Sequence, residues 1–394
     1  MTTAELIALS DKYLMSTYKR IPAVLSRGLG VHVWDKDGKS YLDLVAGIAV
    51  CALGHSHPRV VAAIKKQAET LTHVSNLYYI ENQILLGQLL VENSPLEKAF
   101  FCNSGAEANE AAIKLARKYA HEKMGKKYEL LTMRESFHGR TLATVTATGQ
   151  ERFQEGFAPL PGGFRYVPYN DLEALEEAVT EQTCGVLVEP IQGESGVLIP
   201  APGYLQGIRK ICDEKGILMI VDEVQTGMGR TGTLFACEQE EVVPDMITLA
   251  KALGNGLPIG ALLASERVAA AFVPGTHGST FGGNPLATAA ATATLETILE
   301  EGVLDNCRTV GGYFLDRLKE LKKKKEMIRE VRGRGLILGI ELSVPGAPFV
   351  TKAMERGVLI NCTNGNVLRF VPPLILTKTD VDKALGILDE VLVM

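Results

Sequence analysis

The sequence predicts an α/β fold with a large domain, whose mostly parallel sheet lies between helices, and a smaller α+β domain. The first observation is an alternation of strand-like and helix-like segments from about Ala99 onward, which is typical of a parallel sheet covered by helices on both faces. The second is a change after Pro285, where a long helix precedes short strands and further helices. The third is the composition: 394 residues, 46% hydrophobic and 22% charged, are ordinary values for a globular chain of about two to three domains.

These patterns divide the chain into three parts. Residues 1–45 form an N-terminal segment that is expected to join the small domain. Residues 46–290 form the large domain, and residues 291–394 form the C-terminal small α+β domain. The second boundary falls in or beside the long helix that follows Pro285.

The first hundred residues combine helices with one hairpin. Apolar residues recur at helical spacing over residues 4–15, 58–71 and 81–92, which predicts three helices. Apolar and polar residues alternate on both sides of Asp37-Gly38, and this alternation predicts a β-hairpin over residues 30–43.

The large domain is predicted to alternate between strands and helices. Short apolar runs predict strands over residues 98–102, 128–133, 185–189, 216–221 and 245–250. Helical spacing predicts helices over residues 107–124 and 204–215.

The C-terminal part begins with a long helix from Pro285 to about Glu301. A second helix is expected over residues 310–325 and a last one over residues 378–391, with strands over 337–342, 358–361 and 368–370. The basic run over residues 319–334 also contains glutamates, so we interpret it as a solvated helix face.

Charge and cysteine usage exclude several classes of protein. The net charge of −5 argues against general nucleic-acid binding, and no apolar run approaches the roughly 20 residues of a membrane span. The seven cysteines are scattered and never form CxxC, as expected of reduced thiols in the cytoplasm. His55 and His57 lack cysteine or acidic partners at ligand spacing, so no metal site is expected.

The loop around Ser104 joins a predicted strand to a predicted helix. Ser104 and Glu107 have the spacing of a capping box, which by itself indicates only a well-capped helix. The alternative is a phosphate site, because the first N–H groups of a helix are free and Gly105 lets an anion approach. Both interpretations stay open on these residues.

Polar residues follow several other predicted strands. Asp222 lies just beyond a buried strand, at the edge where open α/β sheets bind ligands. Lys251 follows another buried strand, a position that suits covalent chemistry with a carbonyl group, although a surface lysine is the simpler interpretation. Arg140, in a loop with Phe137, suits a carboxylate. Residues 227–232 match G-x-G-x-x-G but open no helix, so we interpret them as a glycine-rich loop.

Taken together and in this order, the motifs resemble the class III (subgroup II) pyridoxal-phosphate aminotransferases of fold type I. The resemblance extends over essentially the whole chain. The matching stretches are residues 104–109 (SGAEAN), 137–141 (FHGRT), 189–194 (EPIQGE), 222–227 (DEVQTG), 250–251 (AK) and 278–285 (GSTFGGNP).

The resemblance implies a cofactor, pyridoxal 5'-phosphate, and roles for the residues around it. Lys251 and Asp222 would be catalytic: Lys251 bonds to the cofactor aldehyde and then transfers protons, and Asp222 keeps the ring nitrogen protonated. The remaining implied cofactor contacts are Ser104, Gly105 and Ala106 at the phosphate, Phe137 on the ring, Gln225 at the phenolic oxygen, and Thr280, which reaches the phosphate from the partner subunit of a homodimer.

The resemblance also implies the substrates. Residues 13–18, 73–79 and 367–373 are similar to family members that act on N-acetylornithine in arginine biosynthesis, with 2-oxoglutarate as the amino acceptor. Arg140 and Arg369 would bind the carboxylates of these small molecules, and Glu194 would mask Arg369 while the amine donor is bound. Ser279 and Tyr18 are the other implied substrate contacts.

Several alternatives remain open. Within the family, the alternative amine donors are ornithine, succinylornithine, succinyl-diaminopimelate and 4-aminobutyrate. On the same scaffold, an aminomutase or a decarboxylase would not need 2-oxoglutarate. A nicotinamide dehydrogenase would use the 227–232 loop, and a non-catalytic relative would have little reason to retain Lys251 and Asp222.

Overall fold

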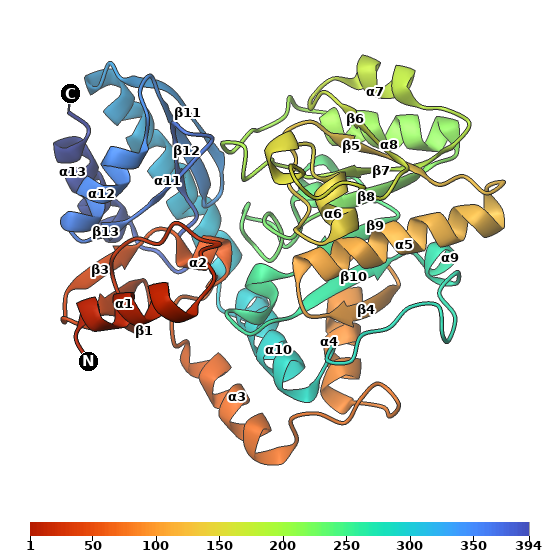
Figure 1. The fold of residues 1–394 in the computed structure, drawn as a ribbon, viewed down its shortest axis with the longest axis horizontal. Helices are drawn as coiled ribbons and strands as arrows, with labels where there is room; N and C mark the ends of the chain where they lie inside the picture. The colour runs from red at the N-terminus through yellow and green to blue at the C-terminus, as the bar shows by residue number, and fades with distance from the viewer. Residues whose placement is uncertain (394) are drawn as a thin grey trace.

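The computed structural model describes residues 1–393 and contains three β-sheets (Figure 1). The largest sheet has seven strands, and its neighbouring strands are parallel except at β10, which runs antiparallel to both of its neighbours. This confirms the predicted mostly parallel sheet. In spatial order the strands are β4 (Lys98–Cys102), β10 (Gly260–Ala264), β9 (Met246–Leu249), β8 (Leu218–Asp222), β7 (Thr183–Val188), β5 (Glu129–Met133) and β6 (Phe164–Val167).

Helices cover both faces of this sheet, as predicted. Alternate residues of β8 point to opposite sides: Leu218 and Ile220 join the apolar cluster under helix α5 (Gly105–Lys123), which crosses in front of the sheet in Figure 1. Met219 and Val221 join the cluster that includes helix α8 (Tyr204–Lys215). Because the central strands are buried on both faces, they appear in the sequence as continuous apolar runs.

The other two sheets lie beside each other, away from the large sheet (Figure 1). One is antiparallel and is built from the C-terminal part of the chain. The other contains the predicted hairpin, and its β3 pairs in parallel with β13, so the N-terminal segment is tied to the C-terminal region. Their strands are β11 (Ile328–Arg334), β12 (Ile337–Leu342), β15 (Val367–Phe370) and β14 (Asn361–Thr363), and β1 (Leu25–Leu29), β2 (His32–Asp35), β3 (Ser40–Asp43) and β13 (Val358–Leu359).

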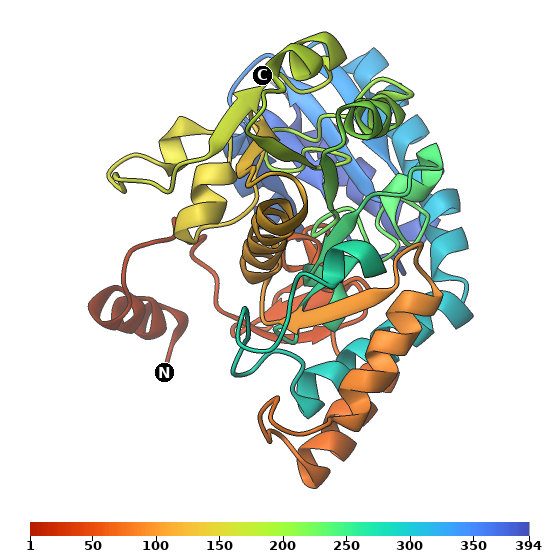
Figure 2. The same cartoon turned by 90° about the vertical axis from the view of Figure 1, so that its right-hand side faces the viewer.

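The remaining helices surround these sheets. Helix α1 (Thr3–Tyr13) has no buried residue and lies at the outer edge of the molecule (Figure 2). Helices α3 (Pro58–Thr70) and α4 (Glu81–Glu92) pack against α10 (Pro285–Glu300). The others are α2 (Ala46–Ala49), α6 (Leu142–Ala147), α7 (Leu172–Ala178), α9 (Glu266–Ala269), α11 (Val303–Lys324), α12 (Ala347–Glu355), α13 (Lys378–Val391) and the 3-10 helices Glu151–Phe153, Ala236–Glu240 and Lys251–Gly254.

Two sequence-based expectations are wrong in detail. Residues 328–334 of the basic run form β11, which pairs with β12, so only residues 319–324 belong to a helix. The helix predicted over residues 310–325 begins earlier, at Val303. None of the helices among residues 1–393 has the length and apolar character that crossing a membrane requires.

Candidate active site

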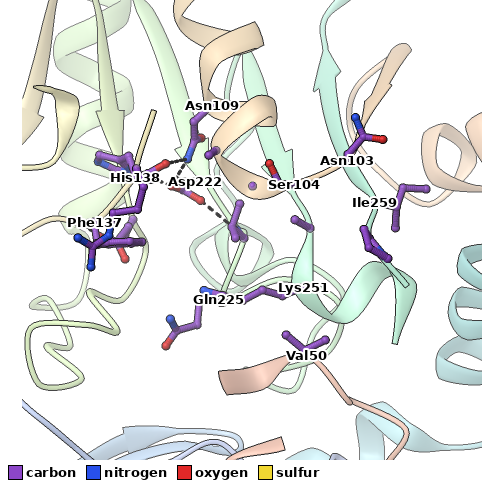
Figure 3. A pocket seen from close by; sticks show the side chains of 18 of the residues that line it. Val50, Asn103, Ser104, Asn109, Phe137, His138, Asp222, Gln225, Lys251 and Ile259 are labelled. Atoms are coloured by element: carbon purple, nitrogen blue, oxygen red, sulfur yellow. Dashed lines mark hydrogen bonds and ion pairs between the residues drawn. The ribbon is translucent and has the colours of Figure 1, made fainter. Parts of the chain in front are cut away.

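A cavity of about 380 Å³ opens at the carboxyl ends of β8 and β9. The polar loops that were predicted to follow these strands lie at this edge of the sheet. Its walls come from segments far apart in the chain, and Figure 3 shows their side chains converging. The predicted site residues that line this cavity are Ser104, Gly105, Ala106, Phe137, Arg140, Asp222, Gln225 and Lys251.

One wall is the N-terminus of α5. The Ser104 hydroxyl accepts a hydrogen bond from the Glu107 N–H at 3.2 Å and so caps the helix. The Glu107 carboxylate bonds to Asn103 N–H at 2.6 Å, so the reciprocal half of the predicted capping box is displaced by one residue. A Cβ atom on Gly105 would lie 2.7 Å from a Val224 methyl carbon, so only glycine fits there. The first N–H groups of this helix line the cavity and suit a phosphate.

Asp222 lies at the end of β8 and is only 4% exposed. Its Oδ2 accepts a hydrogen bond from Asn109 Nδ2 at 2.8 Å and lies 2.8 Å from His138 Nδ1, while Oδ1 accepts one from Val224 N–H at 3.0 Å (Figure 3). Since a carboxylate only accepts, we assign the His138 proton to Nδ1. These contacts hold one carboxylate rigidly at the cavity wall, where it suits a protonated ring nitrogen.

Asn109 and His138 were not predicted as site residues. His138 appeared only inside a motif, and Asn109 lies on the buried face of α5, five residues after Ser104. The signal that identifies Asn109 is a polar side chain among the buried alanines of that face, because buried polar groups require a hydrogen-bond partner.

Lys251 follows β9 at the start of a short 3-10 helix and has a left-handed backbone, with φ of 42°. Its side chain extends through the cavity toward Gln225 in Figure 3. Burial lowers the pKa of its amine, and Arg369 lowers it further, while Glu194 and Asp222 oppose the shift. Lys251 is half-buried and lines the cavity, so the surface-lysine interpretation is wrong, and an amine with a lowered pKa is a better nucleophile.

Glu194 and Arg369 form an ion pair next to Gln225. Arg369 is completely buried and donates to Glu194 Oε1 at 2.7 Å, to Gly193 O at 3.0 Å and to Gln225 Oε1 at 3.3 Å. Burial raises the pKa of Glu194, but Arg369 and Lys251 outweigh it, and the pKa lies below its ordinary value. The pair contacts the cavity-lining Gln225 without lining the cavity itself.

Arg140 is the exposed one among the predicted residues that line the cavity, and the remaining predicted residues do not line it. The guanidinium of Arg140 lies 4.1 Å from the centre of the Phe153 ring. Ser279 and Thr280 line a separate hollow of about 350 Å³, which shares Asn103 with the main cavity. Tyr18 is 72% exposed and lines neither. One chain therefore brings Thr280 and Tyr18 to no shared cavity with Lys251.

Glu189 also lines the cavity, although it was only part of a motif in the sequence. It is 5% exposed and its Oε1 accepts a hydrogen bond from Phe137 N–H at 2.8 Å. Burial raises the pKa of this carboxyl to about 7. The sequence feature that could have identified it is the same as for Asp222: an acidic residue at the end of a buried strand.

We expect Glu189 to lower the stability of the protein as the pH rises. Between pH about 4.5 and 7 the unfolded chain releases this proton while the native chain retains it, so the free energy of unfolding falls. Glu189→Gln removes this dependence, and above pH 7 the variant should be more stable by up to about 3 kcal/mol. Urea unfolding of both proteins between pH 5 and 8 measures the difference. An exposed control, Glu155→Gln, should follow the wild type, and parallel curves for Glu189→Gln would contradict the assignment.

The chemistry of these groups fits one kind of ligand. A helix N-terminus suits a phosphate, a buried lysine amine suits an aldehyde, and a fixed carboxylate suits a protonated ring nitrogen. Residues 227–232, in contrast, form a loop of turns that leads into no α-helix, as expected. The donor set therefore fits pyridoxal phosphate and does not fit a dinucleotide site at that loop.

Comparisons with known proteins identify the family of the chain. The family model "Aminotransferase class-III" matches residues 13–392. The chain is 55% identical over 389 residues to an acetylornithine aminotransferase of Caldanaerobacter subterraneus, covering 98% of this chain and 99% of that protein. It is 53% identical over 392 residues to one of Methanocaldococcus jannaschii, with 99% and 98% covered.

Solved structures with the same fold carry two different names. An ornithine aminotransferase of Toxoplasma gondii superposes with a TM-score of 0.97 at 36% identity, covering all of this chain and 95% of that one. An acetylornithine aminotransferase of Elizabethkingia anophelis superposes with a TM-score of 0.90 at 34% identity, covering all of this chain and 99% of that one.

Proposed function

The chain belongs to the class-III aminotransferase family, and from this premise we propose a specific reaction. The enzyme transfers the terminal amino group of N2-acetyl-L-ornithine to 2-oxoglutarate, giving N-acetyl-L-glutamate 5-semialdehyde and L-glutamate. The observation that carries the proposal is that Lys251 and Asp222 line one cavity with the N-terminus of α5. The relatives named acetylornithine aminotransferase, at 53–55% identity over nearly the full chain, support the choice of donor.

Pyridoxal phosphate, when bound, supplies an aldehyde that bonds to amines and a ring that withdraws electrons, and it holds the amino group between two half-reactions. Ser104 and the N–H groups of Gly105 and Ala106 would hold its phosphate. Phe137 would cover the ring, Gln225 would donate toward the phenolic oxygen, and Asp222 would accept the hydrogen bond of the ring nitrogen. The chemistry and burial of these side chains support the assignment.

Lys251 has two duties in this proposal. Its amine would bond to the aldehyde of the cofactor. Once a substrate amine has taken its place, the same amine would accept a proton from the amine-bearing carbon of the substrate and deliver it to the carbon on the other side of the transferred nitrogen. The lowered pKa of Lys251 supports this use, because an amine must be neutral to accept a proton.

The two substrates are distinguished by their carboxylates. Arg140, exposed at the rim, binds the carboxylate of the N-acetylated donor, and Arg369 binds the second carboxylate of 2-oxoglutarate. Glu194 pairs with Arg369 at 2.7 Å and must move aside for the dicarboxylate. Ser279 and Tyr18, which do not line the cavity within one chain, are the other substrate contacts that we propose.

The assembly that we propose is a homodimer with shared active sites. Leu77, Tyr78 and Tyr79 are 85%, 70% and 97% exposed, and Phe281 on a neighbouring loop is 61% exposed. Exposed large apolar side chains on two neighbouring segments support an interface. Thr280, next to Phe281, then reaches the phosphate in the site of the second subunit.

We propose the same division into domains as the sequence indicates. Residues 46–290 carry the cofactor, residues 291–394 form the small domain, and residues 1–45 join it. The pairing of β3 with β13 supports the assignment of the N-terminal segment.

A panel of amine donors tests the proposed substrate. With 2-oxoglutarate as acceptor, we expect N-acetylornithine to give the highest kcat/KM among acetylornithine, succinylornithine, ornithine, succinyl-diaminopimelate and 4-aminobutyrate. The measurement is glutamate formation at limiting donor. A preference for free ornithine would favour a second candidate function, ornithine aminotransferase, which is suggested by the TM-score of 0.97 with an ornithine aminotransferase. Turnover without 2-oxoglutarate would contradict transamination.

A further inference from the structure

The loop over residues 279–285 is held by three side-chain amides, which we call the amide clamp: Asn76, Asn82 and Gln83. Asn76 Nδ2 donates to Ser279 O at 3.1 Å and to Gly282 O at 3.0 Å. Gln83 Nε2 donates to Gly283 O at 3.2 Å and to Asn76 Oδ1 at 2.8 Å. Asn82 Nδ2 donates to Pro285 O at 3.3 Å. The clamp thus satisfies four backbone carbonyls of one short loop.

Gln83 is the central member of the amide clamp. It projects from the first turn of α4, and its amide bonds both the loop and the clamp residue Asn76. Gly283 has φ of 72°, and a Cβ atom there would lie 2.1 Å from Gln83 Nε2, so the loop backbone rests directly on this side chain. A backbone held this closely has its direction set by Gln83.

The clamped loop carries Ser279 and Thr280 between its fixed carbonyls. Ser279 Oγ accepts from Gly282 N–H at 3.0 Å and from Asn103 Nδ2 at 3.1 Å, so its inner end is also fixed. Thr280 is exposed and lies in a hollow separate from the cavity of its own chain. The loop is therefore held by several hydrogen bonds, but its Thr280 does not share a cavity with Lys251 of the same chain.

We propose that Gln83 is a positioning residue that acts in trans: it holds the 279–285 loop so that Thr280 completes the cofactor site of the second subunit. The inference rests on the proposed homodimer with shared sites. Substitution of Gln83 then impairs the cofactor site of the second subunit. The site of the substituted chain itself stays intact when its partner is normal.

Gln83→Ala tests the first half of the proposal. Loss of two amide hydrogen bonds should weaken cofactor binding by about tenfold, measured by absorbance titration of the cofactor-free protein. Gln83→Glu, which keeps the shape of the side chain but lacks the donors, should behave in the same way. Gln88→Ala is the matched control, because Gln88 lies on the same helix and bonds only to Glu92 among the described residues. Wild-type cofactor affinity in both Gln83 variants would overturn the proposal.

Mixed dimers test the second half. Two differently tagged chains, one Gln83→Ala and the other Lys251→Ala, are co-expressed and the mixed dimer is purified. In this dimer only the Gln83→Ala chain retains Lys251. The site of that chain receives its 279–285 loop from the Lys251→Ala chain, in which the amide clamp is normal. We expect that site to regain wild-type cofactor affinity, with half the turnover of a wild-type dimer. If it stays as weak as the Gln83→Ala homodimer, Gln83 acts within its own chain and the inference fails.

A second mixed dimer separates this outcome from failure of the proposed function. Thr280→Ala paired with Lys251→Ala should also regain one normal site if Thr280 serves the partner. Recovery here without recovery for Gln83→Ala would leave the shared site standing and reject only the role of Gln83. No recovery in either pair would reject the shared site itself and the inference with it.

Discussion

Replacement of Lys251 by alanine is expected to abolish transamination, with kcat lowered by about three orders of magnitude or more. The substitution removes the amine that anchors the cofactor and also the group that moves the proton, and proton transfer alone contributes about 10²- to 10⁴-fold. Steady-state glutamate formation measures the loss, and mass analysis after borohydride reduction should find the cofactor bound to wild type but not to the variant.

Two further substitutions are the controls for the Lys251→Ala experiment. Lys251→Arg keeps a cation in the cavity but has no amine that can bond to the aldehyde, so it should be as inactive as Lys251→Ala. Lys210→Ala removes a lysine of which the side chain is 76% exposed on α8, and it should keep wild-type turnover. Retained activity in Lys251→Arg would show that the positive charge, and not the amine, is what the reaction requires.

The sequence was most informative where one local signal decides the structure. The strands that lead to Asp222 and Lys251 are buried on both faces, so their apolar runs were visible, and the loops after them carry the site. β10 was not predicted: its run Gly260–Ala264 is short, has no period of two and is followed directly by another short element. β11 was not predicted, because its residues after Ile328 are partly or fully exposed and several of them are charged, so the strand has no apolar run.

Contacts between distant segments could not be predicted from local patterns. Asn109 and His138 become site residues only because α5 and the loop after β5 meet at Asp222, 113 and 84 residues further along the chain. The pKa of Glu189 likewise depends on its burial after folding. Residue types at strand ends indicated where the cavity lies, whereas the partners that tune its charges are fixed by packing.

Asp222→Asn is expected to have the second-largest effect, a loss of about 10²- to 10³-fold in kcat/KM, comparable to the removal of one preorganised electrostatic group. Asparagine fits the same space but is neutral, so it does not hold a proton on the ring nitrogen of the cofactor. The bonds from Asn109, His138 and Val224 fix this position, and the neighbouring groups therefore have little freedom to replace the missing charge. The pH dependence of the absorbance of the bound cofactor should shift together with the rate.

The matched control for Asp222→Asn is Asp245→Asn, since both aspartates are buried next to central strands. Asp245 lies just before β9, at the opposite edge of the sheet, and pairs with Arg209 at 2.9 Å and Arg267 at 2.6 Å. Removing its charge takes an ion pair from each arginine, although Arg209 keeps Asp213 at 2.8 Å, so Asp245→Asn should lower the free energy of unfolding while the absorbance of the bound cofactor stays unchanged. The opposite pattern is expected for Asp222→Asn. If both variants lost activity only in proportion to their stability, Asp222 would be a structural residue and the electrostatic role proposed for it would be wrong.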